Sequence, residues 1–103
     1  MSWTVNFYPK ETEKFIRKLS QKDWAAIAIE IQSLKDYGFS GHNDSLKKMA
    51  GLSSVWELKV KEYRIFLTQA GTETIQILHT IVKKSNKTPR EVVELIKNRA
   101  KYF

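Results

Sequence analysis

Apolar and polar residues recur with two different periods along this chain, and the periods predict its elements. Alternation is clearest over Val55–Val60, where every second residue is apolar, and this pattern predicts a half-buried strand. Residues rich in β-branched and aromatic types predict further strands at Trp3–Tyr8 and Tyr63–Thr68. One more short strand is expected at Leu46–Met49. Residues 74–82 are apolar on both faces, which predicts a strand at the centre of the sheet.

Apolar residues at steps of three and four predict two helices between the first and second strands. A short helix is expected over residues 10–19. Ser20 and Asp23 resemble a capping box that starts the second helix, and Gly38 stands where its C-terminal cap is expected. We expect these helices to form an antiparallel hairpin. The buried stripe of the second helix is formed by Trp24, Ile27, Ala28, Ile31 and Leu34.

The last helix carries the strongest start signal in the sequence. Thr88 is the predicted N-cap, Pro89 the first helical residue, and Glu91 the partner that completes a capping box. Its predicted buried stripe consists of Val92, Val93, Ile96, Ala100 and Phe103.

The predicted element order is β-α-α-β-β-β-β-α. Because the later strands follow one another closely, we expect a mostly antiparallel sheet of about four strands in an α+β fold. The helix hairpin should cover one face, with the C-terminal helix gathered on the same side, so that the other face forms an open groove. Residues 1–103 are expected to form a single domain.

Composition excludes several kinds of chemistry. The sequence has no cysteine, which excludes disulfides, thiol catalysis and thiolate metal sites. Its two histidines, His42 and His79, are far apart, so we expect no metal and no other cofactor. The chain shows neither a signal-peptide pattern nor a membrane-spanning segment, and a cytoplasmic protein is expected.

Positive charge is concentrated in the C-terminal half. The formal net charge is +7. Residues 1–54 hold 8 Lys and Arg against 6 Asp and Glu, whereas residues 55–103 hold 10 against 5. The junction between the last strand and the last helix carries four cations without an acid, which predicts a phosphate-binding patch or, alternatively, a solvated basic surface. These cations are Lys83, Lys84, Lys87 and Arg90.

Several motifs in this order resemble the RelE/HigB toxin superfamily, and most closely its phage-derived, HigB-like branch. The resemblance covers nearly the whole chain in element order, and its specific motifs lie between residues 46 and 101. They are L-K-K-M-A-G-L at 46–52, W-E-L-K at 56–59, Y-R-I-F at 63–66, L-H-T-I-V-K-K-S-N-K-T-P at 78–89 and R-A-K-Y at 99–102.

The resemblance implies a toxin of a type II toxin–antitoxin pair. Such a toxin cleaves messenger RNA on the ribosome without a metal, using the ribose 2′-hydroxyl as nucleophile. Its expected partner is a helix-turn-helix antitoxin, and operator DNA would be bound only through the toxin–antitoxin complex. Two alternatives stay open: a non-enzymatic inhibitor of DNA gyrase that resembles the ParE branch, and an inactive relative that only binds RNA.

Cleavage of this kind requires cations that stabilise a crowded phosphate and groups that move two protons. Arg64 is the leading catalytic candidate, because a guanidinium on a strand can bind two phosphate oxygens at once. Lys59 and Lys61, on the predicted polar face of the preceding strand, could bind phosphate or transfer a proton. Arg64 could instead form a structural salt bridge with Glu57 or Glu62, and the lysines could be a solvated strand face.

The remaining candidates have weaker arguments. His79 could act as a general acid or base, although a histidine between apolar neighbours is often a packed core residue. The strand-to-helix cations (Lys83, Lys84, Lys87 and Arg90) are expected to bind RNA. Tyr102 could reach the groove from the end of the last helix, or could simply pack or fray there. The general acid and base stay unassigned.

Overall fold

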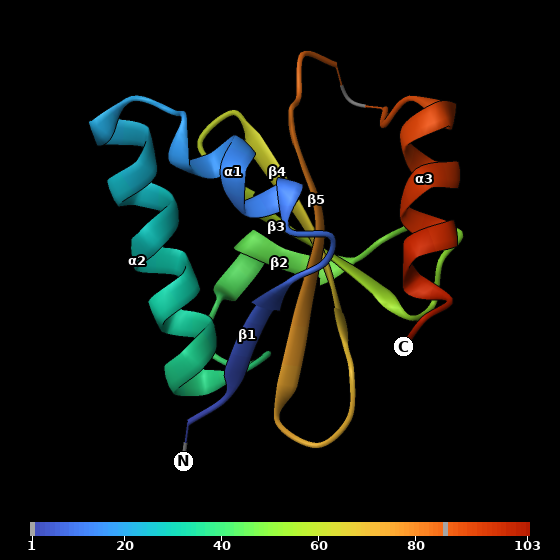
Figure 1. Cartoon of the computed structure of the whole chain (residues 1–103), viewed down its shortest axis with the longest axis horizontal. Helices are drawn as coiled ribbons and strands as arrows, with labels where there is room; N and C mark the ends of the chain where they lie inside the picture. Colours follow the sequence, from blue (N-terminus) through green and yellow to red (C-terminus); the bar gives the residue numbers. More distant parts are fainter. Residues whose placement is uncertain (1, 86) are drawn as a thin grey trace.

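A mixed sheet runs through the centre of the molecule and carries helices on both faces (Figure 1). The computed structural model describes residues 2–85 and 87–103. No helix within those ranges is long and apolar enough to span a bilayer. The elements are β1 Thr4–Phe7, α1 Glu11–Arg17, α2 Gln21–Tyr37, a 3-10 turn Asn43–Ser45, β2 Leu46–Lys48, β3 Val55–Val60, β4 Tyr63–Gln69, β5 Thr74–Val82 and α3 Arg90–Ala100.

The strands lie in the order β1-β5-β4-β3-β2. Neighbours are antiparallel except for β1, which is parallel to β5. The predicted α+β class, the element order and the mostly antiparallel sheet are therefore confirmed, with five strands in the described residues where about four were expected. The central position predicted for residues 74–82 is also confirmed, because β5 lies between β1 and β4.

The helix hairpin covers one face of the sheet. Apolar residues of α1 and α2 pack there against alternate residues of β3, β4 and β5. The Ser20 hydroxyl accepts a hydrogen bond from the Asp23 N–H at 3.2 Å, as the capping prediction requires. Gly38 ends α2 with a φ of 63°, and any side chain there would collide with Trp3. Fully buried members of this core include Ile16, Ile27, Leu34, Leu58, Ile65, Leu67, Ile75 and Ile77.

The prediction that all helices share one face is wrong, because α3 covers the opposite face. Ile96 of α3 is fully buried there in a second core with Phe66 of β4 and Leu78 of β5. The two central strands are apolar on both faces, so each face must be covered to remove it from water. On this second face, hollows remain beside the start of α3.

The helix start was predicted one residue too early. Pro89 has an extended ψ of 145° and is itself the N-cap, so α3 begins at Arg90 and Thr88 makes no capping bond. Phe103 was expected in the buried stripe of the helix but follows its end. Its ring, 44% exposed, packs edge-on against Tyr8 at a centroid separation of 5.2 Å.

The turn between β3 and β4 is held against α2 by an ion pair and a hydrogen bond. Lys61 adopts a φ of 54°, a conformation that residues with a side chain seldom take, so the side chain leaves the plane of β3. Its ammonium lies 3.2 Å from the Asp23 carboxylate. The Tyr63 hydroxyl donates a 2.7 Å hydrogen bond to the same carboxylate. These contacts hold the start of β4 against the first turn of α2.

We expect the Asp23→Asn substitution to shift the ionisation of Tyr63. The hydrogen bond to the Asp23 carboxylate, assisted by burial, raises the pKa of Tyr63 to about 12. An asparagine carries no charge to oppose the phenolate, so the pKa should fall toward the ordinary 10.0. Ultraviolet titration of tyrosine ionisation measures the shift in pKa. The Tyr63→Phe variant lacks the Tyr63 contribution, so comparison with it shows which part of the titration curve belongs to Tyr63.

The same raised pKa predicts how stability depends on pH. Because Tyr63 ionises later in the folded chain than in the unfolded chain, its contribution is complete below about pH 10 and disappears as the pH rises through about 12. The difference in melting temperature between wild type and Tyr63→Phe should shrink over this window. A difference that stays constant across the window would contradict the assignment.

Candidate functional site

Three charged side chains meet, and a fourth lies beside them, on the face of the sheet that α3 only partly covers. We call them the charged cluster: Glu57 and Lys59 of β3, Arg64 of β4 and Lys83 just after β5. The register explains the meeting, because Lys59 lies directly opposite Arg64, and Arg64 directly opposite Ile81. Lys83 stands two residues further along and therefore points to the same face. Pairing of the three strands thus brings together residues far apart in sequence.

Glu57 is the centre of the charged cluster. One of its carboxylate oxygens lies 3.6 Å from Nε of Arg64 and 3.6 Å from Nζ of Lys83. All three side chains are only 14–16% exposed, so these ion pairs are less screened than surface pairs. Both separations exceed a good hydrogen-bond length, and both cations keep donors for another partner. From the sequence, Glu57 was expected only as a structural partner of Arg64. Its alternation with Lys59 along the strand could have predicted that both side chains lie on the same face as the site.

Arg64 is held in place by the short turn that precedes it. Its Nη1 donates to the carbonyl oxygens of Lys61 at 3.0 Å and Tyr63 at 2.9 Å. These bonds fix the guanidinium before any ligand arrives. A cation fixed in advance stabilises developing negative charge without the cost of reorganisation.

Two adjoining hollows extend from the charged cluster to the start of α3. One, of about 310 Å³, is lined by Glu57, Lys83 and Lys87 together with apolar walls from Met49 and Val93. The other, of about 320 Å³, shares Lys83 and Lys87 and adds the exposed Lys84. The predicted basic junction therefore borders the cluster, although Lys83 is paired with Glu57 and does not stand alone. Arg90 is exposed at the first position of α3.

Lys61 does not belong to the charged cluster. The prediction that Lys59 and Lys61 share one strand face is wrong, because β3 ends at Val60 and the positive φ of Lys61 turns its side chain away. The Lys61 ammonium pairs with Asp23 of α2, whereas Lys59 is exposed beside Arg64. Only Lys59 of the two can act together with Arg64.

His79 and Tyr102 are also separate from the charged cluster. His79 lies opposite Phe66, and its Nδ1 is 3.2 Å from Nη1 of Arg99 near the end of α3. Burial, with a smaller contribution from Arg99, lowers the pKa of His79. Tyr102 is 72% exposed beyond the end of α3 and contacts Tyr8 at 5.5 Å between ring centroids. His79 is therefore only two residues along β5 from Ile81, the partner of Arg64, but its ring contact is to Arg99 of α3 and not to the charged cluster.

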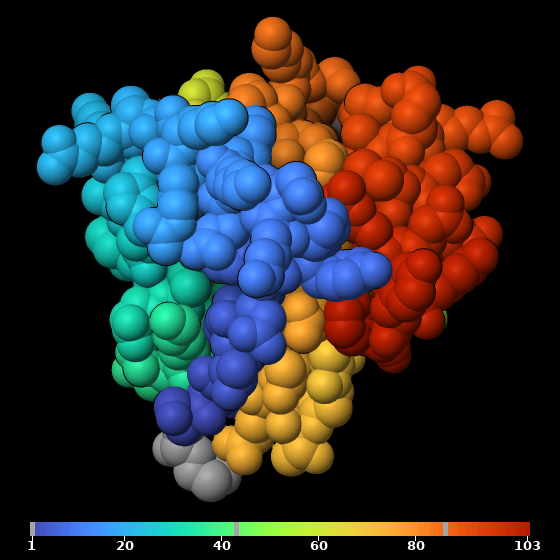
Figure 2. Space-filling view, in the orientation of Figure 1, coloured from blue at the N-terminus to red at the C-terminus, as the bar shows by residue number. Residues whose placement is uncertain are grey.

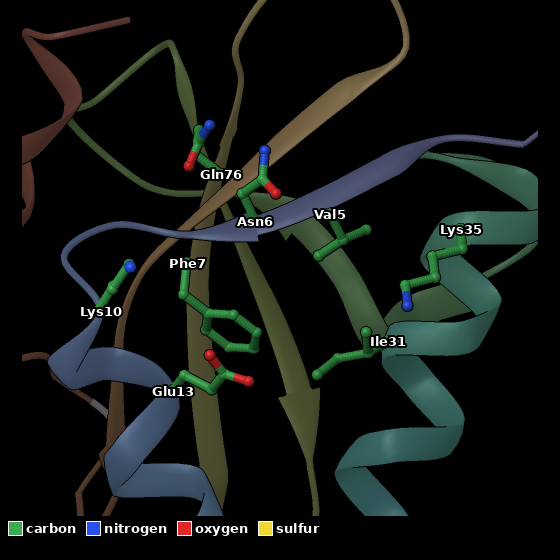
Figure 3. A pocket seen from close by; sticks show the side chains of 8 residues that line it. All are labelled: Val5, Asn6, Phe7, Lys10, Glu13, Ile31, Lys35 and Gln76. Carbon is green, nitrogen blue, oxygen red and sulfur yellow. The ribbon is translucent and has the colours of Figure 1, made fainter.

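A larger hollow, of about 500 Å³, lies on the other face between β1, α1 and α2. Figure 3 shows Phe7 and Ile31 directed toward its interior, with Lys10 and Lys35 on opposite sides. Glu13 also lines the space. Because its two cations do not converge, this hollow offers no counterpart to the charged cluster.

Comparison with protein families shows which family the chain belongs to. A family model described as "Phage derived protein Gp49-like (DUF891)" matches residues 14–101. The chain belongs to this Gp49-like family. No curated protein sequence matches it significantly.

Solved structures share the fold of this Gp49-like protein at low sequence identity. A chain of the archaeal RelE–RelB complex from Pyrococcus horikoshii OT3 has a TM-score of 0.68 at 15% identity, over 82% of this chain and 98% of that one. A chain of the toxin–antitoxin complex RelBE2 from Mycobacterium tuberculosis has a TM-score of 0.62 at 17% identity, over 81% of this chain and 100% of that one. A mutant of E. coli toxin RelE in the free state has a TM-score of 0.64 at 15% identity, over 100% of this chain and 99% of that one. The expected RelE-like fold is confirmed, and the Gp49-like family match confirms the phage-derived part of the resemblance.

We expect the Glu57→Gln substitution to strengthen binding of single-stranded polynucleotides. It removes the negative charge that opposes Arg64 and Lys83 while keeping the shape of the side chain. An effect of about 1 kcal/mol, or about fivefold in Kd, is expected at low salt for charges in partial contact with water. Fluorescence anisotropy with a labelled oligonucleotide measures the change. Glu62→Gln, which alters net charge equally on the exposed turn, is the control, and an equal gain there would contradict a special role for Glu57.

Proposed function

We propose that this protein is the toxin of a type II toxin–antitoxin pair and cleaves messenger RNA on the ribosome. The observation that carries the proposal is the charged cluster on a RelE-like fold: Arg64 and Lys83 both pair with Glu57, Lys59 lies opposite Arg64, and Glu57 and Lys83 line an open hollow. Phosphate is the ligand that such a group of cations recognises, and RNA also supplies its own nucleophile. The description of E. coli RelE as a toxin supports the assignment.

The reaction requires a new bond between the ribose 2′-oxygen and phosphorus, and loss of the bond from phosphorus to the 5′-oxygen. The products are a 2′,3′-cyclic phosphate and a free 5′-hydroxyl. Arg64 and Lys83 would bind the non-bridging oxygens, whose negative charge grows as the phosphorus becomes five-coordinate. Loss of one such donor lowers enzymatic rates by about a hundredfold to a thousandfold in other systems.

Glu57 and Lys59 are the candidates for proton transfer. A phosphate bound by Arg64 and Lys83 would replace Glu57 as their partner and leave its carboxylate beside the 2′-hydroxyl as proton acceptor. Lys59, exposed opposite Arg64, would donate a proton to the departing 5′-oxygen. His79 and Tyr102 have no role in this scheme, because His79 contacts Arg99 and Tyr102 packs against Tyr8.

The proposed partners follow from the same function. Two of the similar structures are complexes, RelE with RelB and RelBE2, and this supports an antitoxin for this chain. We propose a helix-turn-helix antitoxin that neutralises the toxin in the cytoplasm and carries the pair to operator DNA. Inhibition of DNA gyrase is the alternative, and it would require neither ribosomes nor the charged cluster.

Primer extension in a cell-free translation mixture tests the function, and Arg64→Ala tests the cluster. Wild type should cut messenger RNA at defined codon positions only when ribosomes are present. Arg64→Ala should reduce the cleavage rate at least about a hundredfold while the chain still unfolds in a single cooperative transition, at a lower melting temperature because Glu57 loses one of its two partners. Arg17→Ala, which removes the same charge from exposed α1, should cleave normally.

Full activity of Arg64→Ala would refute the catalytic assignment. An absence of cuts by wild type, together with inhibition of purified gyrase, would instead favour the ParE-like alternative.

The basic junction should determine how salt affects ribosome binding. Replacing both Lys83 and Lys84 by alanine removes up to two phosphate contacts, so the slope of log K against log salt should decrease in magnitude by up to about 1.4–1.8. Binding to purified ribosomes is measured over a series of salt concentrations. Lys22→Ala with Lys35→Ala, on α2, is the matched control and should leave the slope unchanged. An equal slope in both pairs would make the junction an ordinary solvated surface.

A further inference from the structure

The second of the two hollows beside the start of α3 differs from the first in its walls. The end of β5, the segment that follows it and the first turn of α3 line this space. Figure 2 shows the end of β5 and the residues after it (orange) next to the start of α3 (orange-red) at the top of the molecule. The volume of about 320 Å³ is near the lower limit of ligand pockets, which extend over roughly 300–1,000 Å³. One large side chain of a partner would occupy much of it.

Aliphatic side chains form the walls of this hollow. Ile81 and Val82 come from β5, Pro89 from the residue before α3, and Val92 from the first turn of that helix. Val82 is 41% exposed and Pro89 is exposed as well, so water contacts this apolar surface. An apolar group that displaced the water would therefore bind favourably.

Three lysines surround the apolar walls, and none of the described lining residues is acidic. Lys83 pairs with Glu57. Lys84 and Lys87 are exposed, and no described acidic residue forms a salt bridge with either. The hollow is thus an apolar pocket with a positive rim, and such a rim attracts a ligand that carries negative groups beside an apolar one.

A protein side chain matches this lining better than a nucleobase does. A base carries donors and acceptors on its edge and stacks on aromatic or guanidinium planes, and the described lining provides neither plane. Lysine only donates, and the Ser85 hydroxyl already donates to the Lys87 carbonyl at 3.1 Å, so the donors of a base would find few partners. An aliphatic side chain has no polar group to leave unpaired.

We propose that this hollow binds an acidic segment of the antitoxin through one large aliphatic side chain. The inference rests on the proposed function, because it takes an antitoxin as the partner. Carboxylates on both sides of the aliphatic anchor would pair with Lys84 and Lys87. Lys83 and Lys87 also line the hollow beside Glu57, so the same segment would occupy cations that the RNA requires. The antitoxin would then neutralise the toxin by direct competition with RNA.

Designed peptides test the chemistry of this site without ribosomes. The probe is a short peptide with two aspartates on each side of a central leucine. In the matched control peptide, asparagine, which has nearly the same shape, replaces the leucine. Binding is followed by nuclear magnetic resonance titration of the Val92 methyl groups. The leucine peptide should bind at least about tenfold more tightly, because only its central side chain gains from leaving water.

Val82→Thr tests whether the leucine enters this hollow. The substitution keeps the shape of an exposed side chain and replaces a methyl group by a hydroxyl. It should weaken the leucine peptide about three- to fivefold and leave the asparagine peptide unchanged. Val5→Thr, the same change in β1 beside the larger hollow on the other face, is the control and should affect neither peptide.

Competition with RNA is measured on the wild-type protein. The RNA probe is a 2′-O-methyl oligonucleotide, which lacks the nucleophile for cleavage, and its binding is followed by fluorescence anisotropy. The leucine peptide should displace it at concentrations at least about tenfold lower than the asparagine peptide. An oligonucleotide that binds together with the leucine peptide would overturn the competition.

The outcomes separate this inference from the proposed function. Equal affinities of the two peptides, or equal binding of the leucine peptide by wild type and Val82→Thr, would overturn the docking site even if the protein cleaves RNA. If Val82→Thr weakens the oligonucleotide and not the peptide, the hollow binds a base and the inference is wrong. Selective binding of the leucine peptide that Val82→Thr weakens supports the docking site, and absence of ribosome-dependent cleavage would then count against the ribonuclease proposal alone.

Discussion

The register between β3 and β4 is the constraint on which the candidate site depends. It places Lys59 opposite Arg64 and leaves Glu57 within reach of both Arg64 and Lys83. If β3 slipped by one residue against β4, Glu57 and Lys59 would both point to the opposite face of the sheet. The register is fixed from the other side of the sheet, where Tyr63 bonds to Asp23 of α2. At the start of β4, Tyr63 therefore fixes the strand against α2, and the next residue, Arg64, places its guanidinium in the charged cluster.

Opposed requirements of stability and function meet near the start of α3. At its start, Glu57 neutralises two cations that would otherwise repel each other, and this same pairing must open when a phosphate binds.

The sequence predicted most of the fold because its signals are local. Alternation located β3, Ser20 and Gly38 bounded α2, and apolar residues on both faces placed β5 at the centre of the sheet. The side covered by α3 was predicted wrongly, since a buried stripe shows that a helix packs but not against which face. Thr88 was misplaced as the cap because Pro89 took that position in extended conformation.

The site was predictable only in part, because its decisive contacts join distant residues. Arg64 and Lys59 were found from their strands, and Lys83 from its unusual run of cations. The pairing of Lys83 with Glu57 crosses the whole width of β4 and leaves no trace in local sequence. The orientation of Lys61 depends on a backbone conformation that residues with a side chain rarely adopt, so alternation gave the wrong face.

The central claim is that Arg64 and Lys83 hold a single phosphate beside Glu57. The most direct measurement is a crystal structure of the protein with an RNA that lacks the 2′-hydroxyl at the cleavage position. The account predicts that nitrogen atoms of both cations lie within hydrogen-bond distance of one phosphate, with Glu57 facing the 2′ carbon. RNA bound across the β1 face, with the ion pairs to Glu57 unbroken, would contradict it.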